Sequence, residues 1–371
     1  LADADDLKTF RDMVNAEDSS SLCARLTADI DLGSDEWTPI YSKSVCEKDY
    51  VTTAYAGVFD GDGHTIRGLS INATTANQGL FSVINGATVK NLNVKGNVTS
   101  TKGYVGGIVG KIQQGNVENC SFSGTVTTDV TGSNGYVGGI AGYAGNTATK
   151  TQTASISGCV NTDRITGGVA GGIVGYAVYT EIESCYNTGA INGTSRAGGI
   201  AGQLQNNCTA THCYNIGTVS GSTTAGGICD FLYSSSKLSD CYSKDVISGA
   251  GGGTVEDCGA LGDASALLGN LGGAFAADSN NINGGLPILS WQVAGGNLPP
   301  APSTTASAIT IVSPQGSTLW AQAGDNHLTE LTLKAECRNM DEETPKLAWS
   351  IDEETAATGQ TAENDQTAYK V

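Results

Sequence analysis

A five-residue glycine-rich phrase recurs along the chain, and this repeat constrains the fold more than any other feature. Gly-Gly-Ile, followed by Val or Ala and then Gly, occupies residues 106–110, 138–142, 171–175 and 198–202, with a degenerate copy at 226–230. The later copies recur every 27 or 28 residues. Such a period is typical of repeat architectures, in which each repeat packs only on its neighbours.

Each repeat also contains two other short phrases rich in β-branched residues. The second phrase is found at Val117–Cys120, Ile182–Cys185 and Leu238–Cys241, and the third at Gly124–Val126, Gly189–Ile191 and Gly217–Val219. Three short apolar phrases per repeat, bounded by Gly or Asn, are too short for helices and favour strands. We therefore predict an all-β fold, a right-handed parallel β-helix over residues 1–294.

The second phrase predicts a one-residue corner in each coil. Val117 and Cys120 are three residues apart, which breaks the alternation of a strand unless one intervening residue turns the chain. The residue before the Cys is of a type that tolerates a left-handed backbone in most coils. This corner column is read as Gly68, Asn91, Asn119, Gly158, Ser184, His212, Asp240 and Asp257.

The column after the corner predicts a ladder of buried thiols. It reads Leu69, Leu92, Cys120, Cys159, Cys185, Cys213, Cys241 and Cys258. Leu and Cys exchange there, so the position takes an apolar group. Stacked coils lie about 4.8 Å apart with parallel Cβ vectors, a poor geometry for disulfides. The chain has no Cys-x-x-Cys spacing, which disfavours a metal site. Cys23 and Cys46 lie outside the ladder, and whether they pair is left open.

The ends of the β-helix and a second domain are also predicted. Residues 5–14 read as a capping helix with Asp3 or Asp5 as N-cap, and residues 264–271 as a helix that closes the other end, followed by a final strand at 285–291. Residues 295–307 read as a linker. Residues 308–371 read as a small Ig-like β-sandwich domain, trimmed or cut, with strands at 308–312, 328–337 and 346–351 and with Cys337 followed by Trp349.

Composition and charge exclude several classes of partner. Lys and Arg number 19 and Asp and Glu number 37, which gives a net charge of −18. Duplex binding depends on basic residues that neutralise phosphates, so nucleic acid is not expected. No apolar run reaches the length of a transmembrane helix, so membrane insertion is not expected either. We expect a monomer.

The repeat resembles the GLUG motif of bacterial cell-surface proteins. The resemblance is carried by residues 171–175 with Cys185–Ile191 downstream, while Phe59–Ile66 and Leu286–Gln292 resemble the ends of such modules. It covers about residues 1–292 and implies an extracellular or wall-attached protein of adhesin type, followed by a bacterial Ig-like domain. GLUG repeats also accompany IgA-cleaving metallopeptidases, but the His-Glu-x-x-His zinc helix of that class is absent from this sequence.

No group of residues predicts catalysis. The three His, at 64, 212 and 327, occur in turns or in the second domain, and no Gly-x-Ser-x-Gly nucleophile elbow is present. Asp60 and Asp62 fit a tight turn, with a calcium site as the open alternative. We expect no enzyme activity, no cofactor and no metal. The alternative is a polysaccharide-active β-helix enzyme, a lyase or a glycosidase.

Tyr186, Tyr214 and Tyr242 directly follow the Cys column in three successive coils. If each Cys points inward, alternation turns these rings outward, and they either pack together across strands or form a ligand-binding stripe. We name them the tyrosine stripe. The sequence thus predicts an extracellular, non-catalytic bacterial surface module for adhesion or display, whose partner is a glycan or a host surface protein.

Overall fold

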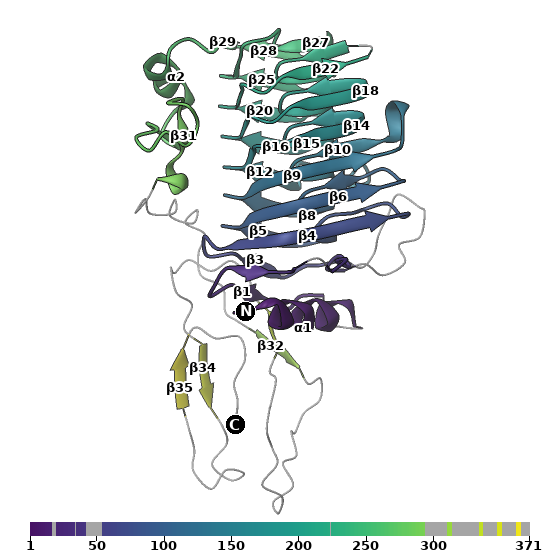
Figure 1. Cartoon of the computed structure of the whole chain (residues 1–371), viewed down its shortest axis with the longest axis vertical. Coiled ribbons are helices and arrows are strands. Elements are labelled where there is room, and N and C mark those ends of the chain that lie inside the picture. Colours follow the sequence, from purple (N-terminus) through teal and green to yellow (C-terminus); the bar gives the residue numbers. More distant parts are fainter. Residues whose placement is uncertain are drawn as a thin grey trace, which may run out of the picture.

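The computed structural model describes residues 1–16, 20–33, 35–41, 54–222 and 224–293, together with four short strands beyond them. Figure 1 shows the parallel strands stacked coil upon coil along the long axis of the molecule. The fold is a parallel β-solenoid of about seven turns, as the repeat predicts.

Two large parallel sheets form the walls of the solenoid. The first consists of β1 (Ala24–Arg25), β3 (Val58–Asp60), β5 (Phe81–Lys90), β8 (Val109–Glu118), β11 (Ala141–Ala144), β12 (Ala154–Ser157), β15 (Val174–Val178), β16 (Thr180–Glu183), β19 (Ala201–Gln205), β20 (Thr209–Thr211), β24 (Cys229–Leu232), β25 (Lys237–Ser239), β27 (Ser248–Gly251) and β28 (Thr254–Glu256).

The second sheet consists of β2 (Ile30–Asp31), β4 (Thr65–Ala73), β6 (Asn93–Ser100), β7 (Val105–Gly106), β9 (Ser121–Thr128), β10 (Tyr136–Gly138), β13 (Val160–Asn161), β14 (Ile165–Gly171), β17 (Tyr186–Asn187), β18 (Ile191–Gly198), β21 (Tyr214–Asn215), β22 (Val219–Gly221), β23 (Thr224–Gly226), β26 (Tyr242–Ser243) and β29 (Gly259–Ala260). A short 3-10 helix, η1 (Gly132–Asn134), lies between β9 and β10.

The register stacks like residues from one coil to the next. Ile156 pairs with Ile182, and this column continues through Ala210 and Leu238. The Ile residues of the glycine-rich phrase are likewise fully buried: Ile108, Ile140, Ile173, Ile200 and Ile228. Because each repeat places its apolar side chains at the same point of the coil, the core is one continuous column.

The one-residue corner is confirmed in seven coils. Its residues have φ between 51° and 59°: Asn91, Asn119, Gly158, Ser184, His212, Asp240 and Asp257. The assignment of Gly68 and Leu69 to these columns is wrong. Leu69 pairs with Gly96 after a register shift. The corner between Asp60 and Thr65 contains four residues, whereas the equivalent corner of the next coil, between Lys90 and Asn93, contains two. That coil turns at Asp62 and Gly63 instead, so Gly68 lies on the next wall.

The thiol ladder is confirmed in five of its six positions. The side chains of Cys120, Cys159, Cys185, Cys213 and Cys241 are fully buried, and all are thiols. Cys258 is also a thiol but is half-buried, because no coil stacks above it in the described chain. Cys46, and with it the proposed Cys23–Cys46 pair, lies outside the described residues.

The N-terminal capping helix is confirmed as α1 (Ala4–Asn15). The Asp3 carboxylate caps it by accepting hydrogen bonds from the backbone N–H groups of Asp5 and Asp6, at 3.0 and 2.9 Å. Leu7, Phe10 and Val14 are buried against the first coils. This helix therefore covers one end of the apolar column (Figure 1).

The second predicted helix forms, as α2 (Ala264–Leu271), but it does not close the other end. Its buried Leu267 and Leu271 pack with the tyrosine stripe on the flank of the solenoid. Val255, which continues the inward column above the fully buried Leu238, is 45% exposed. The closing role expected for α2 is thus corrected.

The chain then runs along the same flank. It contains β30 (Phe275–Ala276), β31 (Ile288–Leu289) and the short 3-10 helix η2 (Ser290–Gln292), and β30 and β31 pair antiparallel. The final strand expected at residues 285–291 is therefore only two residues long. We call residues 264–293 the C-terminal cover.

Beyond the cover, four strands form two antiparallel pairs. They are β32 (Thr310–Ser313) with β33 (Lys334–Glu336), and β34 (Leu347–Ser350) with β35 (Thr361–Asn364). The linker at 295–307 and Cys337 lie outside the described residues, and the Ig-like domain stays a prediction.

Candidate functional site

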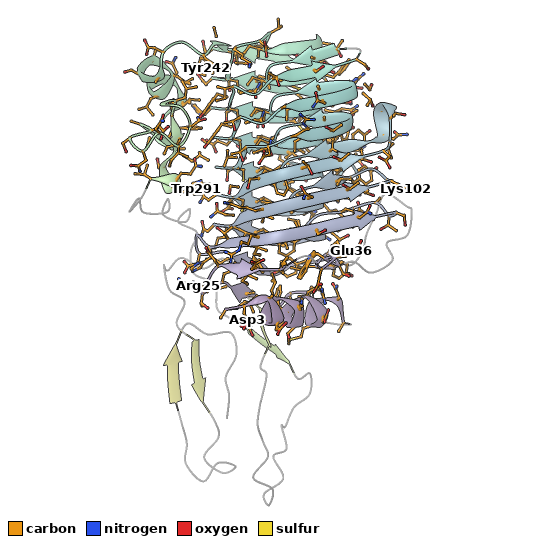
Figure 2. All side chains as sticks on the ribbon, viewed as in Figure 1. Asp3, Arg25, Glu36, Lys102, Tyr242 and Trp291 are labelled. Atoms are coloured by element: carbon orange, nitrogen blue, oxygen red, sulfur yellow. The ribbon has the colours of Figure 1, made fainter. Side chains whose placement is uncertain are left out.

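The tyrosine stripe lies on the outside of the β-helix core but is not exposed. Tyr186, Tyr214 and Tyr242 pair in register through β17, β21 and β26. Their exposed fractions are only 2%, 0% and 8%. Of the two alternatives left open by the sequence, packing of the rings across strands is present, and the C-terminal cover packs over the stripe (Figures 1 and 2).

Specific contacts attach the cover to the stripe. The ring of Phe275 lies 5.7 Å from that of Tyr214. The Tyr214 hydroxyl donates to the Pro287 carbonyl and accepts from the Asn283 side-chain amide at 2.6 Å. The Tyr186 hydroxyl donates to the Gln292 side-chain oxygen at 2.8 Å.

Trp291, labelled on the same flank in Figure 2, donates from its indole N–H to the Gly158 carbonyl at 2.9 Å. Burial raises the pKa of Tyr186 to about 12, and that of Tyr214 also rises because of burial. Both phenols are neutral at physiological pH. The stripe therefore serves as the docking surface of the cover.

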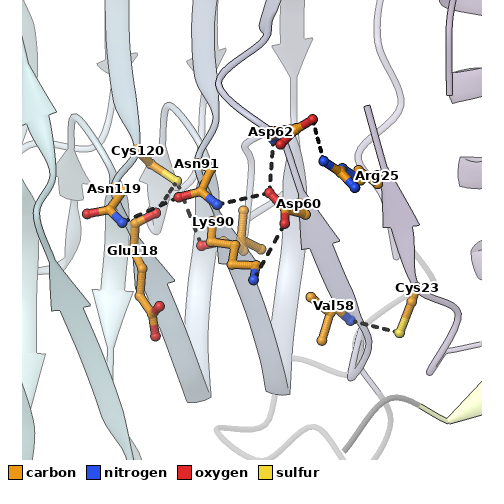
Figure 3. Close-up of polar contacts among 11 residues, drawn as sticks. Cys23, Arg25, Val58, Asp60, Asp62, Lys90, Asn91, Glu118, Asn119 and Cys120 are labelled. Atoms are coloured by element: carbon orange, nitrogen blue, oxygen red, sulfur yellow. Dashed lines mark hydrogen bonds and ion pairs between the residues drawn. The ribbon is translucent and has the colours of Figure 1, made fainter. Parts of the chain in front are cut away.

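The two aspartates considered for calcium are engaged by basic and amide side chains. Asp62 forms an ion pair with Arg25 at 2.8 Å, and Asp60 forms one with Lys90 at 3.5 Å (Figure 3). Asn91 donates to Asp60 at 3.0 Å, and the Asp62 backbone N–H donates to Asp60 at 2.9 Å, as in an Asx turn. The turn expected from the sequence is present, and it is stabilised by ion pairs to neighbouring coils.

One more acidic group lies beside this turn. Glu118 continues the outward column of Asp60 and Lys90 on the next coil. Burial raises its pKa, and the charge of Lys90 partly opposes the rise. Within the described ranges, no group of three or more His, Cys, Asp or Glu side chains is arranged to hold a metal ion.

The histidines take part in local contacts. His64 Nδ1 lies 3.3 Å from Asp29 Oδ1. His212 occupies the corner column, as expected, with Nε2 4.0 Å from Asp240 Oδ2 in the next coil. His327 lies outside the described residues.

The structure assembles an aromatic site that the sequence reasoning missed. Tyr104, Tyr136, Tyr143 and Tyr176 gather where the chain bends at the glycine-rich phrase, and we call them the tyrosine cluster. Tyr136 stacks on Tyr104 with centroids 5.6 Å apart and on Tyr176 at 4.7 Å. Tyr143 contacts Tyr104 edge-on at 5.4 Å and Tyr176 at 5.2 Å. All four side chains are half-buried.

The glycine-rich bend explains this gathering. Tyr104 and Tyr136 precede the bend, while Tyr143 and Tyr176 follow it and pair in register. A Cβ at Gly175 would lie 2.5 Å from the Val137 backbone nitrogen, and one at Gly142 would collide with the backbone of Tyr104 and Val105. Only glycine lets the two walls approach this closely, so residues on their outer sides meet.

Cationic side chains lie at two places along this aromatic surface. The Lys111 ammonium lies 5.2 Å from the Tyr143 ring and 5.9 Å from the Tyr104 ring. The Arg196 guanidinium lies 4.1 Å from the Phe231 ring and donates to the Gln203 side chain at 2.7 Å. Such cation–π contacts hold charged groups against rings. The Tyr176 hydroxyl donates to Gln205.

A usable signal for the tyrosine cluster is present in the sequence. Tyr-Val precedes Gly-Gly-Ile at residues 104 and 136, and Tyr follows the phrase at 143 and 176. Relating these tyrosines requires knowing that the bend is sharp enough to bring its two flanks together.

Comparison with known families identifies the repeat. The family model described as the GLUG motif matches residues 102–127 and 133–166, so the matched segments include the first two copies of the glycine-rich phrase. The tyrosine cluster begins within these segments. No curated protein matches the chain.

A solved structure supports the same fold. The chain is similar to a crystal structure described as "a putative immunoglobulin A1 protease from Bacteroides ovatus", with a TM-score of 0.59 and 24% sequence identity. The match covers 78% of this chain and 91% of that chain. At this identity, the likeness shows a shared β-solenoid fold. No helix in the described part of the chain is long and apolar enough to cross a membrane.

Proposed function

We propose that this GLUG-motif β-helix is an extracellular bacterial surface module that binds a macromolecular partner through its side wall and does not transform it. The tyrosine cluster is the observation that carries the proposal. Four partly exposed aromatic rings on successive coils, held by a rigid stack of strands, form an extended recognition surface.

The location rests on the repeat. GLUG-motif proteins are usually extracellular surface proteins. A net charge of −18 also suits a protein that stays dissolved in an extracellular medium.

A binding role is also consistent with the ion pairs that three aspartates form in the described solenoid. Asp60 and Asp62 are each neutralised by a basic side chain, and Asp230 is buried beside Arg196. Hydrolytic or eliminative chemistry on a polysaccharide needs acid and base groups that converge on the substrate with matched pKa values. These ion pairs instead tie neighbouring coils together.

Two measurements test the proposal. Antibody labelling of intact and lysed producing cells should show the chain at the cell surface. The purified 371-residue chain should bind at least one member of a combined array of glycans and host extracellular proteins. An empty array would contradict the binding role, and intracellular labelling would contradict the extracellular location. Release of reducing or unsaturated sugars from pectin, alginate or host glycans would establish the enzyme alternative instead.

A further inference from the structure

The faces of the central rings in the tyrosine cluster are already occupied. Tyr136 has Tyr104 stacked on it with planes 10° apart, and Tyr176 stacked on it with planes 24° apart. Tyr143 contacts all three of these rings at 5.2–6.3 Å. Both faces of Tyr136 are therefore covered by rings, and Tyr104 and Tyr176 each have one face covered by Tyr136.

This arrangement distinguishes between two classes of partner. A sugar ring packs its C–H groups flat on an open aromatic face. Tyr136 has no open face, because Tyr104 and Tyr176 stack on it. A protein surface can contact ring edges with aliphatic side chains and can exchange hydrogen bonds with the hydroxyl groups. Tyr and Arg are also the residues enriched among those that dominate protein–protein affinity.

The cluster is also rigid before binding. Each tyrosine has only two side-chain torsions, and each ring is fixed by its neighbours. The Tyr176 hydroxyl is held by Gln205. Little conformational entropy is therefore lost when a partner orders these side chains, which raises affinity per contact.

The net charge of the chain indicates the sign of the partner's net charge. The chain carries −18 overall, which steers basic proteins toward it and repels acidic ones. The two cations at the cluster do not reverse this sign, because they are engaged within the molecule. Lys111 is only 7% exposed beside Tyr143, and Arg196 pairs with Gln203 and Asp230.

We infer that the tyrosine cluster is a protein-binding surface for a partner of net positive charge, which contacts the exposed parts of Tyr136, Tyr143 and Tyr176. This inference rests on the proposed function and names the class of partner. The surface spans at least two coils of the solenoid, on the walls formed by β10 with β14 and by β11 with β15.

The test uses the full chain and defined probes. Native chain, Tyr136→Ser and Tyr143→Ser are compared on an array of purified extracellular proteins with basic and acidic members of similar size, printed beside a glycan array. Tyr179→Asn is the matched control, because Tyr179 is also half-buried and its φ of 48° suits Asn. Thermal unfolding confirms that each variant is folded.

The expected result is binding to basic members of the array, weakened at least about ten-fold by Tyr136→Ser and by Tyr143→Ser and unchanged by Tyr179→Asn. Higher salt should lower the association rate constant, because salt screens the electrostatic attraction between the acidic chain and its basic partner. Binding to glycans alone, or protein binding that both cluster variants retain, would overturn the inference and leave the proposed function standing. An empty array for the native chain would overturn both.

Discussion

The rings of Tyr186 and Tyr214 lie parallel, with centroids 4.9 Å apart and planes differing by 2°. This spacing follows from the register of adjacent coils, which pairs the two residues directly. Both rings are buried under residues that follow the last coil. A column that looks like a surface stripe in the repeat therefore works as an internal docking surface.

The buried hydroxyl of Tyr214 should control how firmly the cover is attached. Tyr214→Phe leaves the ring stack but removes an acceptor for Asn283 and a donor to Pro287. We expect the cover to lose about 1–3 kcal/mol of attachment free energy. Limited proteolysis should then cut faster within residues 272–293.

Tyr242→Phe is the control for that variant, because the Tyr242 hydroxyl donates to the Asp257 carbonyl of the next coil at 3.1 Å. Its cleavage rate in the cover should match that of the native chain. Equal cleavage of all three proteins would show that the Tyr214 hydroxyl does not hold the cover.

The thiol ladder predicts an order of reactivity. In the native protein Cys258 should react with an alkylating reagent well before Cys120, Cys159, Cys185, Cys213 or Cys241, because Cys258 is the one partly exposed thiol of the ladder. Burial raises the pKa of Cys159, Cys213 and Cys241, and a hydrogen bond with Cys241 together with burial also raises the pKa of Cys258, so exposure rather than pKa sets the expected order. Peptide mass mapping after a short pulse measures this. Early labelling of Cys185 would contradict the stacking of the coils.

The corner column predicts a stabilising substitution. Ser184 has a φ of 51°, which is unfavourable for most residues with a Cβ, whereas Gly158 fills the same corner one coil earlier. Ser184→Gly should stabilise the protein by about 0.5–1 kcal/mol, and Ser184→Val should destabilise it by about 1–3 kcal/mol. Denaturant midpoints compare the three proteins. A more stable Val variant would show that the corner is not left-handed.

Asp230 predicts a pH effect on stability. Its side chain is fully buried, with Thr224 donating to it at 2.9 Å and Arg196 3.8 Å away. Burial raises its pKa, so the folded state holds the proton more tightly than the unfolded state. The contribution of Asp230 to stability is thus fully present below the ordinary aspartate pKa of about 3.9 and is lost as the pH rises through its raised pKa.

In Asp230→Asn this loss should disappear. The free energy of unfolding should fall less between pH 4 and pH 7 in the variant than in the native chain, as measured by denaturant titration at each pH. Equal slopes for both proteins would contradict a raised pKa at Asp230.

Local rules predict the coil well from sequence. The interval between Val117 and Cys120 is enough to place the corner, and the corner column, in which Asn, Asp and Gly predominate, is enough to give its left-handed backbone, because both depend on a few adjacent residues. The same reasoning fails at Gly68 because two extra residues after Asp60 shift the register of that coil. An insertion of this kind has no local signature.

The long-range parts could not be predicted in this way. The apolar pattern of residues 264–271 was enough to predict a helix. Its position on the flank, rather than over the open end, depends on contacts that Phe275, Asn283 and Gln292 make with the tyrosine stripe, whose residues are distant in sequence. The tyrosine cluster likewise depends on how sharply the glycine-rich bend folds. These are properties of packing between coils rather than of any one repeat.

Tyrosine footprinting tests the central claim most directly, namely that the tyrosine cluster is partly exposed and the tyrosine stripe is covered. Hydroxyl-radical labelling with mass spectrometry should modify Tyr136, Tyr143 and Tyr176 in the free chain and leave Tyr186 and Tyr214 unmodified. Adding a bound basic protein should protect the first three residues. Strong labelling of Tyr186 and Tyr214, with the cluster unmodified in the free chain, would contradict the account.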